Sequence, residues 1–173
     1  MYADFIRKEL QRAGHNSPIC SADSDNGYCL CMVEADGERT FLTVPGIECH
    51  FKREWSENLN AENYDSVYVS GYELEGDGGD AILDFLEEHR EMTVYYAPGP
   101  RITYISEEKA KRMYALHPVL HLNELEAVTS TKEEEIAKAS EKLQGWTGNT
   151  VFDHIRKRRR SSSGGWRASY DSV

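Results

Sequence analysis

The sequence predicts an α/β protein: a partial Rossmann-like parallel sheet with flanking helices, preceded by a protruding β-hairpin. Two observations predict this class. From residue 65 onward, short apolar runs alternate with stretches of helical periodicity, the pattern of βαβ units. Ahead of them, two β-rich runs flank Asp36-Gly37, a dipeptide typical of tight hairpin turns.

The N-terminal segment 2–13 is predicted to be a helix. Phe5, Ile6 and Leu10 recur at helical spacing, and Gly14 ends the pattern. This segment lacks the apolar run of a secretory signal.

The hairpin is predicted from the runs 27–34 and 38–45. Because side chains alternate across a strand, Cys29 and Cys31 share one face of it and Leu30 lies on the other. A hairpin placed ahead of the parallel layer would protrude from the sheet edge as a flap or lid.

The parallel sheet is predicted from four apolar runs with helices between them. The strands are 66–71, 93–98, 118–123 and one beginning at 149–152, and the helices are 78–90, 106–116 and 131–144. Ser106 and Thr131 are the predicted N-caps of the last two helices. Such a sheet buries both faces and binds ligands at the carboxyl ends of its strands. The loops near Gly71, Ala97 and Asn123 are therefore the predicted site.

Charge is distributed unevenly along the chain. The net charge is −10, but residues 153–173 hold six bases and two acids of the 20 and 30 in total. That leaves 14 bases against 28 acids, a net of −14, in residues 1–152. A domain this acidic argues against nucleic-acid binding.

The four cysteines show no paired Cys-x-x-Cys spacing, so we expect reduced thiols in a cytoplasmic protein. A metal site using Cys29 and Cys31 with Cys49 and His50 is the alternative, although two thiols on one strand are more often packing residues. No apolar run is long enough to span a membrane. No Gly-x-Ser-x-Gly or P-loop motif supplies a competing catalytic site.

Four segments occur in an order and spacing similar to those of one family. They are DGERTFLTVPG (36–46), YVSGYEL (68–74), APGPRITYISEEKA (97–110) and LHLNELEAVT (120–129). Together they resemble the ribokinase-like sugar kinases, the PfkB carbohydrate kinase family, over about residues 2–152. The resemblance implies a ribokinase-like fold, a sugar substrate, and ATP with Mg²⁺ as cofactors.

The sharpest element is Asn123-x-x-Glu126, which matches the motif with which the family organises magnesium and phosphates. Hard oxygen ligands, often acting through water, suit Mg²⁺. The resemblance implies that Asn123 and Glu126 organise the ion and the phosphates and that neither binds the metal directly. The alternative from the residues alone is structural: Asn123 caps a short helix and Glu126 is a solvated acid.

The resemblance also gives the hairpin a role, because family members use a small β-sheet lid to cover the sugar. It places Cys29, Cys31 and Thr43 on the sugar-facing side. Lid-to-lid pairing is frequent in the family, and a two-stranded ribbon alone is marginal, so we expect a homodimer through the lid in the intact parent protein.

The sequence also departs from the family pattern at positions that bear on catalysis. Ala97 stands where the family commonly has Asp before a Pro-Gly loop. The family's catalytic Gly-Ala-Gly-Asp segment is absent from the chain, as are its first strand and the Gly-Gly-Asn loop. No catalytic residue is therefore assigned, and we expect the chain as written to be inactive.

Residues 153–173 form a second segment, an Arg-, Ser- and Gly-rich tail whose composition predicts disorder. We expect no regular structure over 154–173. The abrupt change after Phe152 suggests a reading-frame shift, since synonymous codons read one base later encode a strand-turn-strand similar to the family's. A basophilic-kinase site or a nuclear-import patch at 156–161 is the alternative.

These observations predict a fragment of an ATP-dependent sugar kinase. The alternative from another class is a non-catalytic binding or regulatory fragment that acts through protein contacts. A third hypothesis is a nucleic-acid binder that uses the basic tail.

Overall fold

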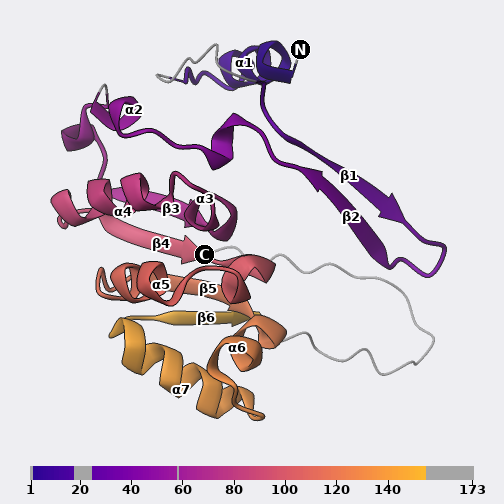
Figure 1. The fold of residues 1–173 in the computed structure, drawn as a ribbon, viewed down its shortest axis with the longest axis vertical. Coiled ribbons are helices and arrows are strands. Elements are labelled where there is room, and N and C mark those ends of the chain that lie inside the picture. The colour runs from indigo at the N-terminus through magenta and orange to yellow at the C-terminus, as the bar shows by residue number, and fades with distance from the viewer. Residues whose placement is uncertain (1, 18–24, 58, 155–173) are drawn as a thin grey trace.

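The computed structural model describes residues 2–17, 25–57 and 59–154 (Figure 1). Within them, four strands form a parallel sheet in the spatial order β3-β4-β5-β6. These strands are β3 (Ser66–Ser70), β4 (Thr93–Ala97), β5 (Val119–Asn123) and β6 (Val151–His154). The parallel pairing confirms the predicted fold class.

Helices fill the crossovers between these strands (Figure 1). They are α3 (Gly71–Glu75) and α4 (Gly79–Glu88) after β3, η3 (Gly99–Thr103) and α5 (Glu107–Tyr114) after β4, and α6 (Glu124–Thr131) and α7 (Ile136–Thr147) after β5. The segment before the sheet contains α1 (Tyr2–Arg12), η1 (Ile47–Cys49), α2 (Arg53–Glu57) and η2 (Ala61–Asn63). Ser106 caps α5 as predicted, because its hydroxyl accepts the amide of Lys109 at 3.3 Å.

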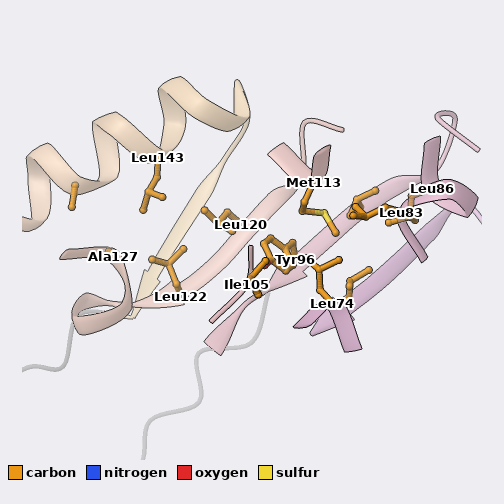
Figure 2. Close-up of a cluster of buried hydrophobic side chains, with 13 residues drawn as sticks. Leu74, Leu83, Leu86, Tyr96, Ile105, Met113, Leu120, Leu122, Ala127 and Leu143 are labelled. Atoms are coloured by element: carbon orange, nitrogen blue, oxygen red, sulfur yellow. The ribbon is translucent and has the colours of Figure 1, made fainter. Parts of the chain in front are cut away.

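The hydrophobic core lies between the sheet and these helices (Figure 2). Leu83, Met113 and Leu143 from the helices are fully buried, as is Leu120 from β5. Tyr96 is buried with them, and this burial raises the pKa of its phenol, which stays neutral. Full burial of one such side chain contributes about 1.5–3 kcal/mol.

The opposite face of the sheet is open within the described residues. Tyr68 is 66% exposed and Tyr95 is 44% exposed, and His121 is also exposed. The prediction that both faces are buried is therefore wrong for this part of the chain. Strands β3 to β6 follow one another in sequence and in space, so crossovers of one hand place every intervening helix on the same side.

The predicted helix 131–144 is wrong at its start. Thr131 is the last residue of α6, and its buried hydroxyl donates to the carbonyl of Ala127 at 2.8 Å. Lys132 then takes the left-handed conformation (φ 59°), and α7 begins at Ile136. The helix that begins directly after β5 uses Thr131 as its end, so the residue cannot act as an N-cap.

The hairpin is present as predicted. Strands β1 (Tyr28–Val33) and β2 (Arg39–Val44) pair antiparallel, and Gly37 turns with φ 88°. The carboxylate of Asp36 supports the turn by accepting the amide of Glu38 at 3.0 Å. Figure 1 shows the hairpin reaching away from the parallel sheet, and every residue of both strands is exposed.

At the other end of the described chain, β6 runs to His154 and pairs with β5 throughout. The expectation that residue 154 lacks regular structure is therefore wrong at this one position, and the strand passes the predicted boundary at 152 by two residues. Positions 155–173, the rest of the predicted tail, lie outside the described residues. None of the helices described is long and apolar enough to cross a membrane.

Candidate active site

Three strands end at one edge of the parallel sheet, at Ser70, Ala97 and Asn123 (Figure 1). Ser70 is paired in register with Ala97, while Asn123 is paired with His154. The loops predicted to carry the site therefore do share one edge. In open α/β sheets this carboxyl edge is where ligands bind.

The edge is tightly built where β3 turns directly into α3. A Cβ added at Gly71 would lie 2.0 Å from the carbonyl oxygen of Pro98 and 3.0 Å from the Cβ of Arg101. No side chain fits in that space, so a glycine is needed for α3 and η3 to pack side by side.

Asn123 and Glu126 meet at the start of α6 in a reciprocal capping box. The Asn123 carbonyl oxygen Oδ1 accepts the amide of Glu126 at 2.9 Å, and Glu126 Oε2 accepts the amide of Asn123 at 3.0 Å. The Asn123 amide Nδ2 also donates to Glu126 Oε1 at 2.7 Å. The structural alternative for Asn123, helix capping, is thus realised in the structure. The same contacts hold the Glu126 carboxylate against Asn123 at the end of β5.

Replacing Asn123 by Ala should lower the free energy of unfolding by about 1 kcal/mol, because α6 loses its N-cap. Urea denaturation measures this difference. Asn123→Ser keeps a capping oxygen and should retain most of the stability. A loss with Ser as large as that with Ala would contradict the capping role.

An ion pair that the sequence analysis did not find joins the two elements at this edge. Arg101 of η3 forms a bidentate pair with Glu75 of α3, and both side chains are 29% exposed. The Arg101 guanidinium also lies 4.3 Å from the ring centroid of Tyr104. The hydrogen bonds that Arg101 donates to Glu75 raise the pKa of Arg101, so the guanidinium stays charged. The sequence feature that could have indicated this ion pair is Arg101, a single basic residue directly after the turn-forming run Pro98-Gly99-Pro100.

Next to this pair, the Ser70 hydroxyl donates to the carboxylate of Glu73. Glu73 and Glu75 thus lie in α3, directly after the carboxyl end of β3. Glu126 lies in the first turn of α6, directly after the carboxyl end of β5, so both of these strands are followed by acidic residues.

The lid residues are also partly brought together. Cys29 and Thr43 are cross-strand partners, with Sγ 3.4 Å from Oγ1, and Cys31 lies on the same face opposite Phe41. All three predicted lid residues are exposed. They belong to the hairpin sheet, separate from the sheet that ends at Asn123.

The metal alternative for the cysteines has no support in the described residues. No group of three His, Cys, Asp or Glu side chains there is arranged to hold a metal ion. His50 pairs through Nδ1 with Asp77 at 3.1 Å. Partial burial, with help from Glu48, raises the pKa of Cys49, which disfavours the thiolate that a metal requires.

The base of the hairpin is anchored by Glu48. Its two carboxylate oxygens accept the amides of Gly27 and Gly46, each at 3.0 Å. Partial burial acts to raise the pKa of Glu48, but these backbone hydrogen bonds outweigh it, and the pKa lies below its usual value. A charged Glu48 therefore holds the two strands together where they leave the protein.

An open parallel sheet with polar residues at its carboxyl edge and a separate exposed hairpin defines the ribokinase-like class of α/β proteins. Two solved structures show the same fold. They are a ribokinase from Giardia lamblia (TM-score 0.72, 14% identity, 91% of this chain and 54% of that one) and a ribokinase from Thermotoga maritima (TM-score 0.69, 14% identity, 96% and 57%).

Sequence comparison identifies the family. The model of the pfkB family of carbohydrate kinases matches residues 1–152. The uncharacterized sugar kinase YegV of Escherichia coli (strain K12) is 37% identical over 127 residues, which is 73% of this chain and 40% of that protein. The chain belongs to the pfkB carbohydrate kinase family, and it spans less than half the length of this curated relative.

Proposed function

We propose that this chain is part of an ATP-dependent sugar kinase, which transfers the γ-phosphoryl group of ATP to a carbohydrate hydroxyl. Residues 1–152 form its partial ribokinase-like domain, with the lid at 27–45. A protein of this kind acts on a small soluble substrate, and we assign it to the cytoplasm.

The observation that carries the proposal is the Asn123–Glu126 pair at the carboxyl edge of β5. Its position agrees with the family motif, and the membership of the chain in a carbohydrate kinase family supports the same chemistry. Phosphoryl transfer depends mainly on positioning and on neutralising charge, which are tasks for groups held rigidly at such an edge.

The donor set of this pair fits Mg²⁺. Asn123 and Glu126 offer an amide and a carboxylate oxygen at an accessible strand end, and hard oxygen ligands are what Mg²⁺ takes. When bound with ATP, the metal would neutralise phosphate charge. The role of Glu126 is to present its carboxylate toward the waters of such an ion, and the role of Asn123 is to fix the orientation of that carboxylate.

We further propose that residues 153–173 derive from a change of reading frame, although the first two of them still pair with β5. The switch from apolar strand residues to an Arg- and Ser-rich segment supports this. A frame shift is also compatible with the genetic code, because a set of synonymous codons for 153–172 exists that encodes a family-like strand-turn-strand when it is read one base later. The kinase site would then be completed by residues that the shifted frame does not encode.

Sequencing the gene across codons 145–175 and assaying the product of the restored frame tests the function. We expect ADP release that depends on one member of a sugar panel. Asn123→Ala and Glu126→Gln should each lower activity or apparent Mg²⁺ affinity by about 10–100-fold, the usual effect of residues that orient metal ligands.

Asn60→Ala is the matched control, because Asn60 is exposed and makes no side-chain cap. Glu126→Gln keeps an oxygen for the Asn123 amide, so its effect on activity is separable from helix stability. A restored protein that hydrolyses no ATP with any sugar, or is indifferent to both variants, would refute the proposal.

The hairpin should also make the protein dimerise. Leu30 and Leu42 are cross-strand partners on one face and are 53% and 57% exposed. A two-stranded ribbon with this apolar face gains stability from a second copy. We expect sedimentation equilibrium to show a dimer, and Leu30→Lys with Leu42→Lys to convert it to a monomer.

Tyr64→Lys is the control for that change, since Tyr64 is equally exposed (57%) but lies outside the hairpin. A clean monomer at high concentration of the unmodified protein would count against dimerisation through the lid.

A further inference from the structure

A cavity of about 720 Å³ opens on the helix layer, away from the residues assigned to phosphoryl transfer. It lies among η3, α5, α6 and α7, and neither Asn123 nor Glu126 lines it. Its volume is in the range of small-molecule sites, about 300–1,000 Å³. It is a candidate site in its own right.

The cavity has an apolar and aromatic lining. Ile102 and Ala110 supply apolar surface, and Tyr114 and Trp146 supply two rings with centroids 5.7 Å apart and planes inclined by 31°. Trp146 is 41% exposed although it is the largest apolar side chain of α7. Burial raises the pKa of Tyr114 to about 12, so its ring is uncharged at neutral pH. Such a surface suits a flat aromatic ligand.

The charges of the lining leave one cation unbalanced. Lys111, Lys132 and Glu107 line the cavity, and Lys111 is paired with Glu107 at 2.7 Å, so the net positive charge comes from Lys132. Lys132 follows α6 in the left-handed conformation. This positive charge runs against the acidic character of residues 1–152. A net positive charge beside an aromatic surface is complementary to an anion, and Lys111 can share its ammonium group between Glu107 and such a ligand.

We propose that this cavity binds a small planar aromatic anion, a ring that lies against Trp146 and Tyr114 and carries a carboxylate or similar group near Lys111 and Lys132. The site is independent of the sugar and of the phosphoryl donor.

The test uses the 173-residue chain labelled with 5-fluorotryptophan, whose three tryptophans are Trp55, Trp146 and Trp166. Fluorine NMR follows each resonance, assigned by Trp→Phe substitution, during titration with 2-naphthoate. We expect the Trp146 resonance to shift and saturate while that of Trp55 does not move. The neutral 2-naphthamide should bind about five-fold more weakly, since an exposed ion pair contributes up to about 1 kcal/mol. Acetate, which lacks a ring, should not bind.

Two sets of variants then locate the ligand. Lys111→Gln with Lys132→Gln should together weaken naphthoate binding by about five-fold, to the affinity of naphthamide, and leave naphthamide binding unchanged. Lys138→Gln is the control, because Lys138 is exposed on α7 but does not line the cavity. Ala110→Leu should fill the cavity and abolish binding of both probes, whereas Ala137→Leu, at an exposed position of the same helix layer, should not.

Three results would overturn the proposal: shifts that do not saturate or that affect Trp55 equally, equal affinity for naphthoate and naphthamide, or lysine variants that bind like the parent. The lysine variants change only exposed side chains, so the test holds even where Ala110→Leu fails to fold.

Discussion

A polypeptide of these 173 residues should produce no measurable sugar-dependent ADP. The family's base and anion hole belong to a Gly-Ala-Gly-Asp segment that the sequence does not contain. A general base contributes about 10²–10⁴-fold and a positioned anion hole about 10²–10³-fold, so the rate should fall by roughly four to seven powers of ten. A coupled ADP-release assay over a sugar panel measures it.

The product of the restored reading frame is the positive control for that assay. Sugar-dependent ADP release by the purified 173-residue chain itself would overturn both the inactivity and the frame-shift proposal. An inactive chain that binds a partner protein specifically would instead favour the alternative function, a regulatory fragment.

Gly71→Ala should destabilise the protein by about 1–3 kcal/mol, the range for overpacking a close contact. The added Cβ would lie 2.0 Å from the Pro98 carbonyl oxygen, and because that atom belongs to the backbone, a main-chain shift is needed to relieve the clash. Moving α3 from η3 would also strain the pair of Arg101 with Glu75. Urea denaturation monitored by circular dichroism gives the difference in the free energy of unfolding.

Gly145→Ala is the matched control for that substitution. Gly145 lies inside α7, and a Cβ there would meet nothing within 4 Å. Because glycine is a poor helix former, this second change should stabilise the protein by about 0.5–1 kcal/mol. A Gly71→Ala variant as stable as the parent would show that the close approach to Pro98 does not limit this position.

The close contact at Gly71 makes the carboxyl edge of the sheet sensitive to substitution. The contact at Gly71 joins two segments that are distant in the chain, the turn after β3 and the turn after β4. The site depends on that junction, because Ser70 and Ala97 reach the same edge only when β3 and β4 pair in register.

Features that depend on neighbours in the chain could be predicted from the sequence. The alternation of apolar runs with helical stretches determined the parallel sheet, since local periodicity reflects which side chains are buried. Asp36-Gly37 determined the hairpin turn because a positive φ at the glycine is a local requirement. Ser106 as an N-cap is local for the same reason.

The candidate site was found in part. Asn123 and Glu126 were identified because their spacing is a motif, and their capping contacts span three residues. Arg101 and Glu75 were missed, because 26 positions separate them and no local pattern indicates that they pair.

Other features were decided by the tertiary structure alone. Thr131 looked like a helix start, but the helix begun at Asn123 reaches it first and makes it an end. The open sheet face followed from strand order, which a sequence of strands and helices does not specify. Local patterns report only the contacts of near neighbours. Strand order, the close approach at Gly71 and the ion pair at Arg101 arise from contacts between distant segments, which exist only once the chain has folded.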